Sequence, residues 1–239
     1  APIALGGKAD ADRAVAAARA AFESGPWPRM GYEKRQQLMH RLADLMEQHT
    51  DELAMADTRD MGKPITQARH DVARSIQNVR FFADHARMSV GDALPMDSGH
   101  LAYTRWEPVG VVVAISPWNF PLMLGTWKVM PALAWGNTVV WKPAEDTPVS
   151  ATIVGRLAIE AGFPPGVLNV VHGYGPDSAG SALTENPDVD RITFTGESGT
   201  GKVISGVAAR NLTPVSLELG GKGANIIFDD ADLDNAVHW

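Results

Sequence analysis

The 239-residue chain contains no cysteine. Disulfide bonds, thiolate metal sites and a cysteine nucleophile supplied by this chain are therefore excluded. Long apolar runs are also missing, because the longest, at residues 109–115, is far shorter than the ~20 residues of a membrane-spanning helix. Basic residues are outnumbered, with 21 Lys and Arg against 28 Asp and Glu, and the net charge is −7. This acidic balance argues against nucleic acid or a membrane as the partner.

Patterns for metal binding and export are missing as well. The 7 histidines form no His-x-x-x-His pair, and we expect no metal site. No basic stretch followed by an apolar one occurs near the N-terminus, so we expect no signal peptide and a cytoplasmic location. The chain starts without Met and stops at Trp239 inside a predicted helix. We therefore expect a fragment of a longer protein.

A strand, a helix and a second strand are predicted between residues 109 and 141. The run at 109–115 is apolar and β-branched, as in a buried parallel strand. Pro121 is typical of the first turn of a helix, and Gly136 ends that helix. Residues 138–141 predict the second strand. A βαβ unit of this kind carries its functional groups at the carboxyl ends of its strands.

Helical and strand-like patterns alternate along the rest of the chain. The predicted helices are 9–23, 32–48, 51–61, 65–88, 149–161, 177–183 and 199–210, and the predicted strands are 101–107, 167–171, 191–194, 214–219 and 224–228. Thr50 is expected to cap the third helix, and Asp230 or Asp232 a last one. This order predicts an α/β fold with a doubly wound parallel sheet, an N-terminal helical layer and an exposed strand used in assembly.

One glycine-rich turn could hold phosphate groups. The glycine fingerprint of dinucleotide-binding folds is absent from the first strand-to-helix turn, residues 116–121. Residues 194–202 instead place glycines before a helix, where free backbone N–H groups suit a pyrophosphate, and simple loop geometry is the alternative. The same stretch nearly matches a nucleoside-triphosphate loop, but Val203 replaces the Ser or Thr that would bind magnesium. Glu197 would repel phosphate oxygens unless its side chain points away.

Two carboxylates follow predicted strands. Glu145 can accept hydrogen bonds from ribose hydroxyls, and Lys142 is near enough to share them. A surface ion pair is the alternative for these two residues. Glu218 lies between Leu217 and Leu219, where apolar neighbours favour a partly desolvated carboxylate suited to general-base chemistry. A solvated strand end is the alternative for Glu218.

Four arginines cluster in the predicted helix at 65–88, namely Arg69, Arg74, Arg80 and Arg87. Such a cluster is usually a solvated helix face. One of the guanidinium groups could still bind a substrate carboxylate.

Four motifs occur in a fixed order: Ser-Pro-Trp-Asn-Phe-Pro at 116–121, Trp-Lys-Pro-Ala-Glu at 141–145, Phe-Thr-Gly at 194–196 and Leu-Glu-Leu-Gly-Gly-Lys at 217–222. Together they resemble the NAD(P)-dependent aldehyde dehydrogenase superfamily, and the resemblance covers essentially the whole chain. It implies oxidation of an aldehyde to a carboxylic acid through a thiohemiacetal and a thioester. Asn119 would donate its amide to the oxyanion, and Glu218 would activate the water that releases the acid.

The resemblance also implies a Rossmann-like domain that binds NAD, with NADP as the alternative. Lys142 and Glu145 would hold the adenosine ribose, while Trp118 and the turn after Phe194 would line the pyrophosphate. The implied cofactor-binding residues are Ile115, Ser116, Trp118, Lys142, Glu145, Gly175, Phe194, Gly196, Glu197, Leu219 and Gly220.

The chain departs from this superfamily in two ways. The family's nucleophile is a cysteine in a region beyond Glu218, and this chain ends before it, so we expect the chain alone to be inactive. Ser is also more frequent in the family at the position of Glu197. Residues 194–198 and 175–180 are similar instead to hydroxymuconic and aminomuconic semialdehyde dehydrogenases.

The resemblance divides the chain into four parts. They are an N-terminal helical layer at 1–100, a bridging strand at 101–108, the Rossmann-like NAD-binding domain at 109–220 and the start of a truncated catalytic domain at 221–239. The expected partners are a small-molecule aldehyde and further copies of the enzyme, as a homodimer or homotetramer. A P-loop-like nucleotide hydrolase and a non-catalytic cofactor-binding fragment are the alternative functions.

Overall fold

The computed structural model describes residues 3–97 and 99–238. A five-stranded sheet forms its centre, in the order β5-β4-β3-β6-β7, and all of its neighbouring strands are parallel. The strands are β3 (Val111–Ile115), β4 (Thr138–Lys142), β5 (Leu168–Val170), β6 (Arg191–Gly196) and β7 (Val215–Leu219). The predicted α/β fold with a parallel sheet is confirmed.

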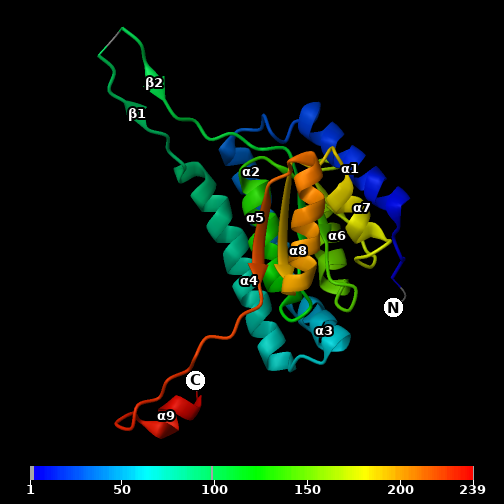
Figure 1. Ribbon diagram of the computed structural model, residues 1–239, viewed down its shortest axis with the longest axis vertical. Helices are drawn as coiled ribbons and strands as arrows, with labels where there is room; N and C mark the ends of the chain where they lie inside the picture. The colour runs from blue at the N-terminus through cyan, green and yellow to red at the C-terminus, as the bar shows by residue number, and fades with distance from the viewer. Residues whose placement is uncertain (1–2, 98, 239) are drawn as a thin grey trace.

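Helices cover both faces of this sheet (Figure 1). One face carries α5 (Pro121–Ala134) and α6 (Val149–Ala161), and the other carries α1 (Lys8–Glu23), α7 (Ala179–Glu185) and α8 (Ser198–Ala208). Alternate residues of β3 point to opposite faces, so that Val112 and Ala114 join the core under α5 and Val111 and Val113 the core under α1. Because both faces are buried, the strand is apolar along its whole length.

A second helical layer lies over α5 and α6. It consists of α2 (Tyr32–Gln48), α3 (Thr50–Met61), α4 (Ile65–His85) and the 3₁₀ turn η1 (Ala86–Met88). A further 3₁₀ turn, η2 (Ala209–Asn211), follows α8. The four N-terminal helices therefore belong to two different layers: α1 packs directly on the sheet, while α2 to α4 form the outer layer.

Three local predictions are wrong. Thr50 is the first residue of α3 and not its cap, because its hydroxyl donates to the Glu47 carbonyl 2.7 Å away. The predicted strand 101–107 shortens to β2 (Ala102–Tyr103), which among the described strands pairs with β1 (Ala93–Leu94) alone. Residues 224–228 form no strand, since no described strand pairs with them and Ile226 and Phe228 are exposed.

Two segments extend away from the body of the molecule (Figure 1). The first is the arm formed by β1 and β2, where Leu101, Tyr103 and Trp106 are exposed. The second follows β7 and ends in α9 (Leu233–His238), whose first turn Asp232 caps by accepting from the Asn235 N–H at 3.1 Å. The capping by Asp232 matches the prediction, whereas Trp239 lies outside the described residues.

Within residues 3–97 and 99–238, no helix combines the length and the apolar composition needed to cross a membrane. That part of the chain also brings together no group of three or more His, Asp or Glu side chains that could hold a metal ion.

Candidate active site

A cleft of about 1490 Å³ opens at the carboxyl ends of β3, β4, β6 and β7. The strands are parallel, so the residues that follow them meet at one edge of the sheet. The structure places every residue of the predicted site along this cleft: Ile115, Ser116, Trp118, Asn119, Lys142, Glu145, Gly175, Phe194, Gly196, Glu197, Glu218, Leu219 and Gly220. Residues from four separate sequence motifs thus form one site, and their individual roles stay predictions.

The turn between β3 and α5 is fixed at its first residue. Ser116 is buried, and its hydroxyl accepts the indole N–H of Trp141 at 2.9 Å. The Trp141 ring fits under α5 because Gly125 has no side chain; a Cβ there would lie 2.1 Å from the ring. Trp118 follows in the turn and is 56% exposed, facing the cleft.

Asn119 presents a free amide at the end of this turn. Its Oδ1 accepts the backbone N–H of Phe120 at 3.1 Å, which leaves Nδ2 on the other side of the side chain. In the described part of the chain Nδ2 has no hydrogen-bond partner. The side chain is exposed and lines the cleft. This orientation makes Asn119 a donor towards the cleft.

Lys142 and Glu145 form an ion pair at the end of β4. The Lys142 ammonium lies 3.3 Å from Oε2 of Glu145 and also donates to the Pro143 carbonyl at 3.1 Å. The Lys142 side chain is 4% exposed, whereas that of Glu145 is 42% exposed. Burial lowers the pKa of the Lys142 ammonium, and the charge of Glu145 opposes this effect. A buried cation beside an exposed carboxylate offers a donor and an acceptor to hydroxyl groups in the cleft.

Glu197 occupies the helix end that was predicted to be open. It is the N-cap residue of α8, and its carboxylate accepts the Thr200 backbone N–H at 3.0 Å. Hydrogen bonds from the Gly199 and Thr200 N–H groups lower the pKa of the Glu197 carboxyl. The prediction of free N–H groups in the 194–202 turn is therefore wrong, because an anionic side chain of the chain itself binds them.

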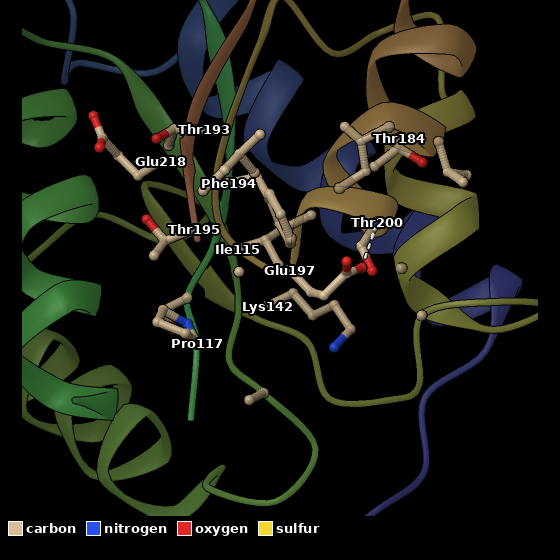
Figure 2. A pocket seen from close by; sticks show the side chains of 18 of the residues that line it. Ile115, Pro117, Lys142, Thr184, Thr193, Phe194, Thr195, Glu197, Thr200 and Glu218 are labelled. Atoms are coloured by element: carbon tan, nitrogen blue, oxygen red, sulfur yellow. Dashed lines mark hydrogen bonds between the residues drawn. The ribbon is translucent and has the colours of Figure 1, made fainter. Parts of the chain in front are cut away.

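Glu218 and Glu197 lie towards different ends of the site (Figure 2). In this view Glu218 lies beyond Thr193 and Thr195, while Glu197 lies close to Lys142. Glu218 is exposed on β7, so the predicted apolar surroundings are not present around it in the described residues. The cleft therefore holds two separate polar ends, one around Glu218 and one around Lys142.

Lys128 is a site residue that the sequence analysis missed. It lies on α5, is 9% exposed, lines the cleft and donates to the Thr193 hydroxyl at 3.3 Å. Burial lowers the pKa of the Lys128 ammonium, while the charge of Glu218 acts in the opposite direction. A usable signal was present, because Lys128 is the one charged residue within the otherwise apolar stretch 121–134.

The structure also brings together residues of α7 and α8 that no motif had indicated. Thr184, Val203 and Val207 line the cleft, and Val203 is 66% exposed although it is apolar. An apolar side chain directed at a cleft suits a flat, uncharged ring. In the sequence analysis, Val203 served only as evidence against magnesium binding.

A second, more open groove of about 790 Å³ lies between α4 and α5. Its α4 side includes His70 and Arg74, and its α5 side includes Phe120, Met123 and Trp127. Trp127 lines the cleft as well, so the two cavities share a wall.

The four arginines of α4 and η1 differ in their partners. Arg69 lies 3.0 Å from Asp51, and Arg80 pairs with Asp44 and Glu47, as expected for a solvated helix face. Neither Arg74 nor Arg87 forms an ion pair within the described residues, and of these two only Arg74 lines the groove. It is therefore the arginine best placed to bind an anionic ligand.

Comparisons with known proteins agree with this geometry. The model of the aldehyde dehydrogenase family matches residues 1–239. A 2-hydroxymuconic semialdehyde dehydrogenase of Pseudomonas sp. (strain CF600) is 50% identical over 236 residues, which are 97% of this chain and 48% of that protein. The mitochondrial aldehyde dehydrogenase family 2 member B4 of Arabidopsis thaliana is 49% identical over 237 residues, with 98% and 44% coverage.

Solved structures match this chain with similar sequence identity and coverage. The NAD+ complex of an aldehyde dehydrogenase from Bacillus cereus has a TM-score of 0.95 and 47% sequence identity, and the match covers 98% of this chain and 48% of that one. The chain spans about half the length of the curated relatives that it matches.

Proposed function

Because the chain belongs to the aldehyde dehydrogenase family, we propose that it is the cofactor-binding part of an enzyme that oxidises an aldehyde to a carboxylic acid with NAD. One observation carries the proposal: Asn119, Lys142, Glu145 and Glu218, from three of the four motifs, line a single cleft at the carboxyl ends of parallel strands. The P-loop alternative is not favoured, since Glu197 binds the helix end that a triphosphate would need.

The residues present fit a dinucleotide. The Lys142–Glu145 pair combines a donor and an acceptor 3.3 Å apart, which suits the two hydroxyls of the adenosine ribose. Thr184, Val203 and Val207, from α7 and α8, give the adjacent wall an apolar surface for the adenine ring. We infer a preference for NAD over NADP, because the Glu145 carboxylate would repel a 2′-phosphate.

Bound NAD would accept a hydride from the substrate. Asn119 would stabilise the oxyanion through Nδ2, the donor that its own turn leaves free. Glu218 would take a proton from water at the other end of the cleft, close to Lys128. The covalent step needs a thiol, and the chain has no cysteine, so the nucleophile would come from protein outside this chain.

We infer that the aldehyde is a semialdehyde with a distal carboxylate. The name of the Pseudomonas relative, 2-hydroxymuconic semialdehyde dehydrogenase, specifies such a substrate. Arg74 supports the assignment, because its guanidinium is unpaired in the described structure and faces a groove that shares Trp127 with the cleft. A guanidinium binds a carboxylate through two parallel hydrogen bonds.

We also propose that the enzyme is a homodimer or homotetramer that assembles through the arm of β1 and β2. Its support is the exposure of Leu101, Tyr103 and Trp106 on a segment that leaves the body of the molecule. A cytoplasmic location and the four predicted domain boundaries stay predictions.

Calorimetric titration of the purified chain with NAD tests the proposal. We expect binding at one site without magnesium, and we expect Lys142→Met to weaken it by about 10-fold or more, the effect of losing a charged hydrogen-bond donor. Arg69→Met is the matched control, because Arg69 lies outside the cleft, and it should leave the affinity unchanged. The chain alone should produce no NADH from aldehydes. Failure to bind NAD, or steady NADH production by the purified chain, would contradict the proposal.

A further inference from the structure

Lys63 is a charged residue in the protein interior. It follows Gly62, the left-handed residue that ends α3, and precedes Pro64, the N-cap residue of α4. Its side chain is 4% exposed and does not line the cleft. A lysine is rarely buried this completely without partners, because removing its ammonium from water is costly. The partners of Lys63 therefore explain its position.

The Lys63 ammonium lies between groups from two different helices. Nζ is 2.5 Å from Oδ2 of Asp71 in α4, whose side chain is 6% exposed. The same Nζ is 3.9 Å from the centroid of the Phe120 ring, at the start of α5. A cation over an aromatic face is attracted to it, and the attraction is stronger when the cation is removed from water. Lys63 thus links the outer helical layer to the residue before α5.

A second buried carboxylate, that of Asp57, is influenced by the charge of Lys63 but forms no ion pair with it in the described part of the chain. Asp57 of α3 is 1% exposed, and its Oδ1 has no hydrogen-bond partner in the described part of the chain. Burial raises the pKa of Asp57 to about 6, and the charge of Lys63 opposes this, while those of Asp60 and Asp71 add to it. The Asp71 carboxylate is thus the partner that holds the Lys63 ammonium beside the Phe120 ring, while the charge of Lys63 offsets part of the cost of burying Asp57.

Phe120 joins this cluster to the cleft. Its carbonyl accepts the Leu124 N–H at 2.9 Å in the first turn of α5, and its own N–H donates to Oδ1 of Asn119 at 3.1 Å. Trp118 and Asn119 are exposed, so the Phe120 ring is the part of this segment that contacts the outer layer. The Asn119 side chain is bonded to the Phe120 backbone, so a backbone shift that follows displacement of the ring would change the position of the amide.

We propose that Lys63 is a positioning residue for the reaction, which sets the place of the Asn119 amide through the Phe120 ring. The inference rests on the proposed role of Asn119 as the oxyanion donor. A catalytic donor has to be held within about 0.5 Å of its productive position. Loosening the Phe120 ring should therefore lower turnover without removing any group from the cleft.

The test uses the full-length enzyme that contains this chain. Lys63→Met keeps the length of the side chain but removes its charge, and we expect kcat to fall by about 10- to 100-fold, as for a small misplacement of a reacting group. The dissociation constant of NAD should stay unchanged. Lys63→Arg retains a cation over the ring and should recover most of the turnover. Arg80→Met is the control, because it also removes a cation that is paired with carboxylates, those of Asp44 and Glu47, but at an exposed site outside the cleft.

Phe120→Leu keeps the test decisive if Lys63→Met fails to fold because the buried Asp71 carboxylate has lost its partner. It retains apolar volume but removes the aromatic face, so we expect a loss of kcat similar to that of Lys63→Met. In combination with Asn119→Ala, neither substitution should lower kcat further, because residues that act through one group are not additive. Losses that multiply, or a folded Phe120→Leu enzyme with the parent kcat, would overturn the inference.

Hydrogen exchange supplies a readout that does not depend on activity. We expect the Phe120 and Leu124 amides to exchange faster in the Lys63→Met protein, with no change in α2. Unchanged exchange at these two amides would overturn the inference whatever happens to kcat. A wrong proposed function would show in the parent enzyme itself, which would then bind no NAD or oxidise no aldehyde.

Discussion

Replacing Asn119 tests whether the free amide of the β3–α5 turn stabilises the oxyanion. The side chain uses Oδ1 to accept the Phe120 N–H at 3.1 Å, and Nδ2 remains as a donor without a partner in the described residues, on a side chain that lines the cleft. Asn119→Ala removes both groups. Asn119→Asp keeps the acceptor and the volume, but it replaces the donor with a carboxylate oxygen. The two variants therefore separate support of the turn from catalysis.

The structure sets different magnitudes for the two effects. Loss of one oxyanion donor lowers kcat by about 10²- to 10³-fold, or roughly 2.7–4 kcal/mol of transition-state stabilisation. Loss of the Phe120 hydrogen bond lowers the free energy of unfolding by about 1 kcal/mol. Asn119→Ala should show both effects. Asn119→Asp should show a loss of kcat at least as large, because a negative charge opposes the oxyanion, while the stability stays close to that of the parent.

Steady-state kinetics at saturating NAD, calorimetry of NAD binding and thermal unfolding measure these quantities in the full-length enzyme. The dissociation constant of NAD should be nearly unchanged in both variants. A merely structural Asn119 would instead lower stability and cofactor affinity together. An Asn119→Asp enzyme with the parent kcat, or an Asn119→Ala enzyme that binds NAD much more weakly but keeps its turnover, would refute the reasoning.

The remaining predictions concern charged residues around the two cavities. Glu145→Gln should reduce the preference for NAD over NADP, measured as the ratio of kcat/KM values with the two cofactors. Equal kcat/KM values of the parent enzyme with NAD and NADP would contradict this role of Glu145. Glu197→Ser should keep α8 capped but remove an anion from the cleft, so the variant should bind NAD about two- to ten-fold more tightly than the parent at low salt. This increase in affinity should be smaller at high salt, where the charge is screened. An NAD affinity equal to that of the parent at low salt would refute this prediction. Arg74→Gln should raise KM for a carboxylate-bearing semialdehyde by about 10-fold or more, whereas Arg69→Gln should not. An equal effect of Arg74→Gln on an uncharged aldehyde would contradict a role in carboxylate recognition.

Helix boundaries were predictable where single residues determine them. Pro121 begins α5, and Gly62 and Gly162 end α3 and α6 with left-handed backbone. These residues act through their own backbone conformation, so no knowledge of tertiary contacts is needed. The predicted site followed from the same logic, because the carboxyl ends of parallel strands must meet.

Predictions failed where a residue depends on a partner distant in sequence. The run 224–228 has strand-like composition, yet a strand forms only beside another strand, and none of those described pairs with it. The expectation of free N–H groups in the 194–202 turn failed for a local reason instead, because the Glu197 carboxylate accepts the backbone N–H of Thr200, three residues further along. Lys63 carried no signal at all, since its contact with Phe120 depends on how α4 packs against α5.

The indole of Trp127 separates the cleft from the groove between α4 and α5. With NAD in the cleft and the aldehyde in the groove, as proposed above, a ligand that displaces the ring would change the space left for the other, and the two binding equilibria would be coupled. The linkage is reciprocal: the factor by which NAD changes the affinity for the aldehyde equals the factor by which the aldehyde changes the affinity for NAD. Trp127 would thereby be the side chain through which one binding equilibrium changes the other.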